Sequence, residues 1–288
     1  MSETLDHQGP TAETLLEDVT GEVVRRARAL TVGALPDAVV RRAQHCVLDW
    51  LGVTIAGADQ EATAIARAEA LDEGGAPRAT LLGTGERVTV RQAALVNGIA
   101  SHVLDYDDVG PAMGGHPSVP VLPALMALAE ERDLPGADLI AAFVAGFETE
   151  SRVGRLVAPE HYERGFHTTG TVGTFGAAAA CAFALGLDES QWRQALGIAG
   201  TQAAGLKSMF GTMSKPLHAG KAAVNGLSAA KLAGRGFTAN PAVLDVPQGF
   251  TSTHTATANP EKALELSSVE FDIRDVLFKF HAACFLTH

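Results

Sequence analysis

Charge is scarce in this sequence, and most of it is negative. Asp, Glu, Lys and Arg make up 19% of the 288 residues, and the formal net charge is −11. Soluble domains usually carry about a quarter of charged residues, so we expect much of this chain to lie in a core or an interface. A chain of negative net charge is a poor partner for nucleic acids and anionic membranes. The net charge does not exclude a small anionic ligand, because a local basic pocket can exist inside an acidic protein.

Cysteine is rare as well. The three cysteines, Cys46, Cys181 and Cys284, are widely spaced and form no CxxC pair. That spacing argues against disulfides and a structural zinc site, and it fits a reducing, cytoplasmic compartment. The first residues are acidic and polar, a pattern typical of neither a signal peptide nor a transit peptide.

The motifs of several enzyme classes are missing. The sequence has no G-x-S-x-G, no G-K-[ST] phosphate loop and no H-E-x-x-H, which disfavours a serine nucleophile, a P-loop and a zinc protease. A metal site built from His102, Asp105 and Asp107 is conceivable but lacks such spacing, and we predict no metal. General acid–base chemistry is favoured instead, because histidines, lysines and acids are abundant and histidine titrates near neutral pH.

One segment lacks charge altogether. Residues 166–187 contain no Asp, Glu, Lys or Arg, and their length would span a bilayer. Their glycines and threonines favour a helix buried inside a globular protein instead. Gly170, Gly173 and Gly176 follow one another at steps of three, which we interpret as close helix packing.

Helical periodicity dominates the rest of the chain. Helices are predicted over residues 12–30, 36–57, 62–75, 90–105, 118–133, 136–157, 167–187, 188–205 and 217–235. A hairpin is predicted over 78–88, with its turn at Gly83–Gly85. The fold class is therefore mainly all-α.

The composition predicts three parts. Residues 1–14 read as a disordered N-terminus and residues 15–265 as one large helical domain. Residues 266–288 mix alternation with aromatics and read as the start of a smaller α+β lid domain, apparently truncated. Since a lone short strand is not stable by itself, the alternative is that this end packs on the helical body.

Cationic side chains stand where several of these helices begin. His116, His167 and Lys215 each precede or open a helix rich in small residues, with His218 one turn further on. A helix N-terminus attracts anions and disfavours a cation by about 0.3–1 kcal/mol. A carboxylate bound between them would explain the placement, so we interpret these residues as one anion-binding, proton-handling pocket. The alternative for each histidine is a structural residue near a helix cap.

Acids gather at the end of an earlier helix. His102 and Asp105 are spaced i, i+3 on the predicted helix, and Asp107 and Asp108 follow. Acids oppose the dipole at a helix C-terminus, which favours a functional cluster. The alternative is a solvated helix end.

The motifs together resemble those of a known family. "NGIASHVLDYDD…HPSVPVLPALMALAE", "RGFHTTGTVGTFGAAAA", "SKPLHAGKAAVNGLSAA" and "FKFHAACFLTH" are similar to motifs of the MmgE/PrpD family, which includes 2-methylcitrate dehydratase, cis-aconitate decarboxylase and iminodisuccinate epimerase. The resemblance implies a large helical domain with a smaller lid domain, a homodimer, and neither metal nor organic cofactor. It also implies a small di- or tricarboxylate substrate from which a proton next to a carboxylate is moved.

The resemblance and the helix-end pattern point to the same residues. The predicted catalytic set is Asp105, His116, His167, Lys215 and Lys279, and the predicted substrate-binding set is His218, Thr168, Cys284 and His102. In this prediction Lys215 binds substrate carboxylates, and His167 or Asp105 takes a proton. His116 or a partner protonates a leaving hydroxyl in a dehydratase or returns a proton to carbon in an epimerase.

The type of reaction is less closely defined by the motifs. Cys284 stands where the family's decarboxylases carry a histidine, and Val109 stands where a threonine is common. Both differences argue against close identity with cis-aconitate decarboxylase, and Cys284, together with how common dehydratases are in the family, favours a lyase similar to 2-methylcitrate dehydratase. A decarboxylase or epimerase of the same family is the alternative, and a non-catalytic helical scaffold or ligand-binding protein is the alternative of another class.

Overall fold

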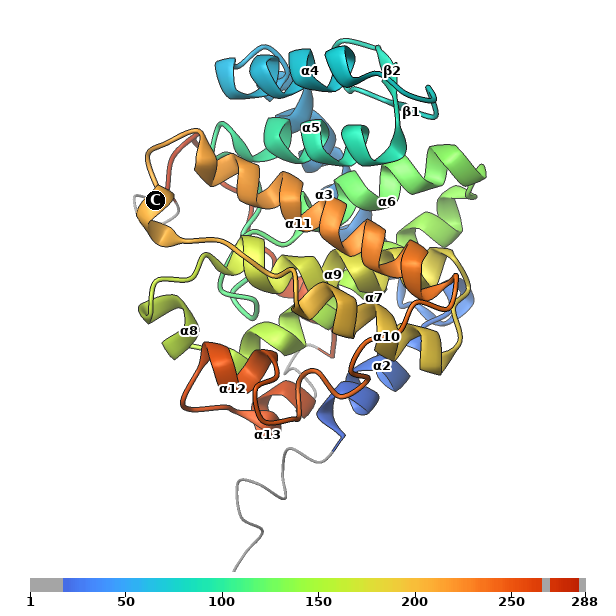
Figure 1. The fold of residues 1–288 in the computed structure, drawn as a ribbon, viewed down its shortest axis with the longest axis vertical. Coiled ribbons are helices and arrows are strands. Elements are labelled where there is room, and N and C mark those ends of the chain that lie inside the picture. The colour runs from blue at the N-terminus through green and yellow to red at the C-terminus, as the bar shows by residue number, and fades with distance from the viewer. Residues whose placement is uncertain (1–17, 266–269, 285–288) are drawn as a thin grey trace, which may run out of the picture.

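The computed structural model describes residues 18–265 and 270–284. In this part of the chain helices dominate, and each of the two strands is only two residues long (Figure 1). The predicted mainly all-α fold class is confirmed. In chain order the elements are α2 (Val19–Arg28), η1 (Val32–Ala34), α3 (Asp37–Gly57), α4 (Glu61–Glu73), β1 (Ala79–Thr80), β2 (Arg87–Val88), α5 (Val90–His102), α6 (Ser118–Arg132), α7 (Gly136–Val157), α8 (Glu160–Glu163), α9 (Thr168–Ala184), α10 (Glu189–Gly200), η2 (Lys207–Met209), α11 (Ser214–Ala233), α12 (Phe250–His254), α13 (Pro260–Leu264) and η3 (Asp272–Asp275).

Helix α9 lies at the centre of the body, between α6, α7, α10 and α11. Its small side chains let the neighbouring helices approach closely, and every residue from Thr168 to Ala182 is buried. A Cβ at Gly173 would come 2.5 Å from the ring of Pro120 on α6, and one at Gly176 would come 2.3 Å from the carboxylate of Glu150 on α7. The interpretation of these glycines as sites of close helix packing is confirmed.

Helices α5 and α11 cross at two glycines. A Cβ at Gly98 would lie 2.6 Å from the Cα of Gly220, so the two backbones nearly touch. His102 is four residues after this crossing on α5, and Lys215 is five residues before it on α11. At a rise of about 1.5 Å per residue, antiparallel helices place these two side chains at the same end of the pair. The crossing therefore determines where the polar residues of both helices meet.

The peripheral elements follow their sequence patterns. Helix α3 buries Val39, Ala43, Cys46 and Trp50 at steps of three or four, as an amphipathic helix does. Strands β1 and β2 pair antiparallel with Ala79 opposite Val88, which confirms the predicted hairpin. None of the helices in residues 18–265 and 270–284 has the length and apolar character needed to cross a membrane.

The C-terminal segment differs from its predicted strand-like character. Described residues 270–284 contain the short helix η3 and one isolated bridge, between Leu277 and Val109, but no strand. Ile273 and Val276 are buried in the core formed by α3, α6 and α7, so this part packs on the helical body. The strand prediction was wrong because a strand buries every second residue, whereas the buried residues here, Ile273 and Val276, are three apart on a helical turn. Residues 1–14, predicted to be disordered, and His288 lie outside the described residues.

Candidate active site

A cavity of about 810 Å³ opens where three helices begin and one ends. The first turns of α9 and α11 line it, His116 lies in the loop just before α6, and α5 ends beside it. The residues of the predicted site that line this cavity are His102, Asp105, His116, His167, Thr168, Lys215 and Cys284. The separate polar clusters of the sequence therefore meet around a single cavity.

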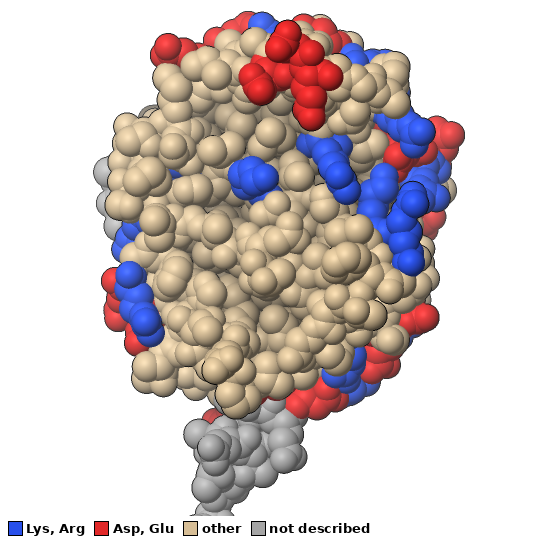
Figure 2. All heavy atoms as spheres, viewed as in Figure 1, with Lys and Arg blue, Asp and Glu red and all other residues tan. Residues whose placement is uncertain are grey.

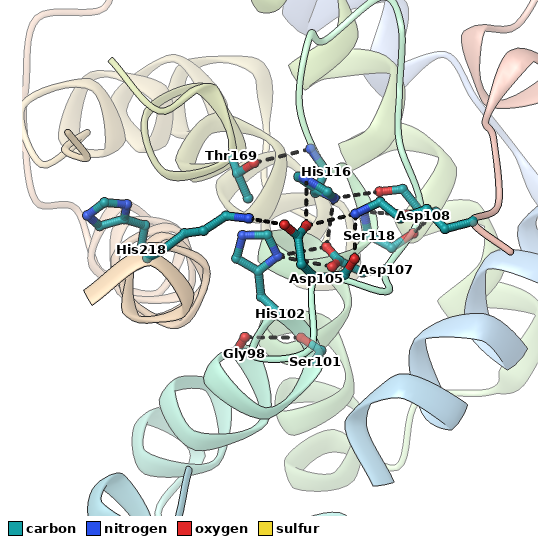
Figure 3. Close-up of polar contacts among 12 residues, drawn as sticks. Gly98, Ser101, His102, Asp105, Asp107, Asp108, His116, Ser118, Thr169 and His218 are labelled. Atoms are coloured by element: carbon teal, nitrogen blue, oxygen red, sulfur yellow. Dashed lines mark hydrogen bonds and ion pairs between the residues drawn. The ribbon is translucent and has the colours of Figure 1, made fainter. Parts of the chain in front are cut away.

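Asp105 lies at the centre of the site (Figure 3) and forms ion pairs with two lysines. Lys215 Nζ donates to Asp105 Oδ2 at 2.5 Å, and Lys279 Nζ donates to Oδ1 at 2.7 Å. Lys279 also donates to the backbone carbonyl of Asp105 at 2.6 Å. The side chain of Lys279 is 0% exposed, whereas that of Lys215 is 16% exposed. Lys279 thus supports Asp105 from behind, and Lys215 faces the cavity.

The chain conformation after α5 places this carboxylate. The helix ends at His102, and Asp105 has a left-handed backbone with φ of 50°, which Asp tolerates better than most residues. The predicted helix over 90–105 is therefore too long at its end, and Asp105 is not one turn above His102 on a common face. It lies on the tight turn that follows, which directs its side chain to Lys215.

Asp105 stays ionised near neutral pH. Burial raises the pKa of this carboxyl, but the hydrogen bonds from Lys215 and Lys279 outweigh burial and lower the pKa to about 2. Near neutral pH Asp105 is therefore a carboxylate with both oxygens engaged. Such a group orients lysines well and is a weak proton acceptor.

His167 caps the start of α9 and is almost fully buried. Its Nδ1 lies 3.0 Å from Nδ1 of His218, and its ring stacks on that of His102 with centroids 5.6 Å apart. Burial, together with the neighbouring histidines and Lys215, lowers the pKa of His167 far below its usual value. The imidazole is therefore neutral before an anion binds. A carboxylate placed beside it would raise that pKa again.

The first turn of α9 is tied to the loop that carries His116. Thr168 Oγ1 donates to the carbonyl of Gly114 at 2.5 Å, and the backbone N–H of His116 donates to Thr169 Oγ1 at 3.1 Å. A Cβ at Gly115 would come 2.9 Å from Thr168 Oγ1. These contacts fix His116 relative to the N-terminus of α9.

The sequence is similar to known proteins over most of its length. Residues 22–263 match the model of the MmgE/PrpD N-terminal domain, which covers most of the chain. The chain belongs to the MmgE/PrpD family.

Curated members of the MmgE/PrpD family extend this comparison. Human cis-aconitate decarboxylase is 35% identical over 283 residues, covering 95% of this chain and 58% of that protein. The mouse cis-aconitate decarboxylase is 35% identical over 283 residues, with 95% and 57% covered. The cis-aconitate decarboxylase of Aspergillus terreus is 30% identical over 292 residues, with 94% and 58% covered. The chain thus spans well under two thirds of the length of these relatives.

Two residues predicted for the site of this MmgE/PrpD chain do not line the cavity. Lys279 lies behind Asp105, and His218 lies behind His167. In Figure 3 His218 points away from the Asp105 cluster. Each contacts a residue that lines the cavity, His167 for His218 and Asp105 for Lys279.

Other lining residues were not foreseen from the sequence. Tyr162, Phe210 and Met213 give the cavity an apolar wall, and Phe210 packs edge-on against His167 with ring centroids 4.9 Å apart. Phe210 and Met213 come from the loop before α11, where neither periodicity nor polarity marks them as functional. The only signal in the sequence is that this loop, with Gly205 and Gly211, directly precedes the predicted site residue Lys215.

Four donor groups lie close enough to suggest a metal ion. Nitrogen or oxygen atoms of His102, Asp105, Asp107 and His116 all lie within 4.8 Å of one another. Both oxygens of Asp105 are already paired with ammonium groups, and those two positive charges oppose a divalent cation at the same place. We therefore do not assign these residues as metal ligands, and the absence of a required metal stays a prediction.

Proposed function

We propose that this chain carries the acid–base centre of a lyase that acts on a small tricarboxylate, without metal or organic cofactor. The observation that carries the proposal is the meeting of Lys215, His116 and His167 with Asp105 around one cavity, where the N-termini of α9 and α11 add positive potential. Such a site suits a substrate with several carboxylates. The cis-aconitate decarboxylases among the relatives make decarboxylation of cis-aconitate the first candidate.

The chemistry of that candidate defines what the site must do. The bond between a saturated carbon and its carboxylate breaks, and CO₂ leaves. The electron pair moves through the neighbouring double bond onto the carbon next to another carboxylate, where it is shared as an enediolate. One proton is then added to that carbon. The protein must therefore bind carboxylates, stabilise the developing negative charge and deliver one proton.

The described residues fit these three tasks. Lys215, at the cavity wall and one hydrogen bond from Asp105, is placed to bind a carboxylate and stabilise the enediolate. His116 lines the cavity with its side chain 13% exposed, and we assign it the proton transfer. His167, kept neutral by burial, serves as a hydrogen-bond partner of the substrate. Asp105 orients the lysines, since its low pKa makes it a poor base.

Dehydration of a 2-methylcitrate-like substrate is the second candidate, because of Cys284. This residue lines the cavity, at the position where the resemblance associates a cysteine with dehydratases. In that reaction the same groups would remove a proton next to a carboxylate while a hydroxyl leaves as water. The two candidates differ in their product masses, since one loses CO₂ and the other loses water.

A homodimer remains part of the proposal. The face of the molecule over α9, α10 and α11 carries few charged side chains (Figure 2). Large apolar side chains are exposed on α11 and in the loop before it, among them Leu206, Met213 and Leu217. A second copy covering this face would explain both features. Sedimentation of the full-length protein tests this, and a strictly monomeric protein contradicts it.

The function is tested with the full-length protein and a panel of tricarboxylates in deuterated water. Decarboxylation yields a product that has lost CO₂ and gained one C–D bond. We expect Lys215→Ala to lower kcat/KM by about 100-fold or more, with unchanged unfolding. Lys221→Ala is the matched control, because Lys221 lies on the same helix, is exposed and does not line the cavity. Equal turnover of both variants, or no reaction of any tricarboxylate, would overturn the proposal.

A further inference from the structure

We infer that Asp107 is a positioning residue, which orients His116 and stabilises the imidazolium that forms when His116 carries a second proton. The inference rests on the proposed function, since it concerns the proton transfer assigned to His116. Asp107 belongs to the acidic cluster noted in the sequence but to neither the predicted catalytic set nor the predicted substrate-binding set, and it does not line the cavity. It lies after the turn that follows α5, in contact with both His102 and His116 (Figure 3).

The hydrogen bonds of His116 determine which nitrogen faces the cavity. Nδ1 of His116 lies 2.9 Å from the backbone carbonyl of Asp108 and 3.0 Å from Oδ2 of Asp107. A carbonyl and a carboxylate can only accept, so Nδ1 must carry a hydrogen. Nε2 is then the nitrogen that gains and loses a proton. It points toward the cavity side, 3.6 Å from Oδ1 of Asp105.

Asp107 supplies the charge that the second proton requires. Its side chain is 1% exposed, and burial alone would raise its pKa, but the nearby His102 and His116 outweigh burial and keep the pKa well below the usual range. The carboxylate is therefore ionised and close to Nδ1. In this poorly hydrated place an adjacent negative charge stabilises an imidazolium much more than it would in water.

His102 holds Asp107 in place from the other side. Nδ1 of His102 lies 2.9 and 3.1 Å from the two carboxylate oxygens of Asp107, and the His102 side chain is 0% exposed. Burial lowers the pKa of His102 although Asp107 opposes it, so His102 donates as a neutral ring. One ionised acid thus bridges a fixed histidine and the histidine that transfers the proton.

Other charged groups around this pair come from every neighbouring element. The acids are Asp49 on α3 and Asp108, and the cations are Lys279 and Lys215, whereas the nearby His167 is neutral. Burial raises the pKa of Asp49 to about 7 and that of Asp108 to about 6. Asp107 is the acid in direct contact with Nδ1 of His116 and stays charged through neutral pH. Asp105 is also ionised and lies near the other nitrogen, 3.6 Å from Nε2, but its two oxygens already pair with Lys215 and Lys279. Asp107 is therefore the nearer acid, at 3.0 Å, and the one that does not pair with a lysine.

The test is Asp107→Asn in the full-length protein, with kcat and KM measured against pH. Asparagine keeps the shape and removes the charge, so we expect kcat to fall by about 100-fold or more with little change in KM. The limb of the pH profile that reports His116 should move to lower pH, because the imidazolium has lost its counter-charge. This shift has the same sign whether His116 acts as acid or base. An unchanged profile and an unchanged kcat would overturn the inference.

Two further measurements keep the inference falsifiable. Glu150→Gln is the control for replacing a buried acid elsewhere, because burial raises the pKa of Glu150 well above its usual value and the replacement removes no charge; its pH profile should match that of the wild type. If Asp107→Asn does not fold, ¹⁵N-histidine NMR of the wild-type protein, assigned with His116→Gln, reads the tautomer directly. A neutral His116 protonated at Nε2 would refute the inference. If the wild type turns over no tricarboxylate, the proposed function fails, and the role of Asp107 is then read from the ¹⁵N signals of His116 against pH, whose transition should move to lower pH in Asp107→Asn.

Discussion

Removing the carboxylate of Asp105 should destabilise the protein through Lys279 more than through Lys215. Asp105→Ala leaves two ammonium groups without their carboxylate partner. The Lys215 side chain is 16% exposed and can turn toward the cavity, whereas the Lys279 side chain is 0% exposed. Breaking one partner of a buried ion pair costs about 3–5 kcal/mol. Lys279 keeps its bond to the backbone carbonyl of Asp105, so we expect about 3 kcal/mol, near the lower end.

The double variant separates the two contributions. Replacing both partners of a buried pair by apolar residues is often nearly neutral, so Asp105→Ala with Lys279→Met should recover most of the stability that Asp105→Ala alone loses. Lys215→Met should cost less than about 1 kcal/mol, as expected for a partly exposed pair. Urea unfolding followed by circular dichroism gives the free energies of all four proteins.

A loss of about 3 kcal/mol is large, because the total stability of a protein is only about 5–15 kcal/mol. The urea midpoint should fall clearly without a change in slope. The reasoning is refuted if Asp105→Ala lies within about 1 kcal/mol of the wild type, or if the double variant is less stable than Asp105→Ala. Either result would mean that water or another acceptor reaches Lys279.

Three further outcomes are expected. The pKa of Asp105 is lowered from 3.8 to about 2, so its contribution to stability is present above about pH 4 and is lost as pH falls toward 2; the stability gap between wild type and Asp105→Asn should close over that range, and a constant gap would contradict it. Both carboxylate oxygens of the buried Glu150 have no hydrogen-bond partner among the described residues, and burial raises its pKa well above the usual value. Because the unfolded chain ionises there while the folded one does not, Glu150 costs stability above about pH 4.5, so Glu150→Met should gain about 1–3 kcal/mol at pH 7 and less at pH 5, measured by urea midpoint. Treatment with a chelator should leave turnover unchanged, and loss that added divalent metal restores would show that a metal is needed after all.

The sequence predicted the helices well because most of them bury one stripe or are apolar throughout. The predicted 136–157 helix agrees with α7 at both ends, and the 36–57 helix agrees with α3 to one residue. The predicted helix ends were wrong where the local backbone conformation, and not the hydrophobic pattern, determines where a helix begins or ends. Helix α5 ends at His102 because the chain turns at Asp105, and α11 begins at Ser214, so Lys215 lies in its first turn. Neither helix end alters the spacing of apolar residues from which the helices were predicted.

The choice among neighbouring acids could not be predicted from the residues. Asp105, Asp107 and Asp108 are chemically equal in the sequence, yet each has a different partner in the structure. Asp105 contacts two lysines, Asp107 contacts two histidines, and Asp108 accepts from the backbone and hydroxyl of Ser118 at the start of α6. These differences arise from how the chain turns after α5 and from which helices cross beside it. Sequence spacing carries no information on either.

Cations at helix N-termini were the signal from which the pocket was first inferred, and the structure shows how they are tolerated. The sequence suggested that a bound carboxylate offsets Lys215 at the start of α11. In the structure the protein's own carboxylate, that of Asp105, occupies this role at 2.5 Å. A substrate carboxylate that binds Lys215 must therefore compete with Asp105 or share the lysine with it. Because Lys279 holds the other oxygen of Asp105, the acid stays in place while Lys215 is free to turn. The pair of lysines thus separates two tasks, since the buried one fixes the acid and the accessible one can exchange an internal carboxylate for that of a substrate.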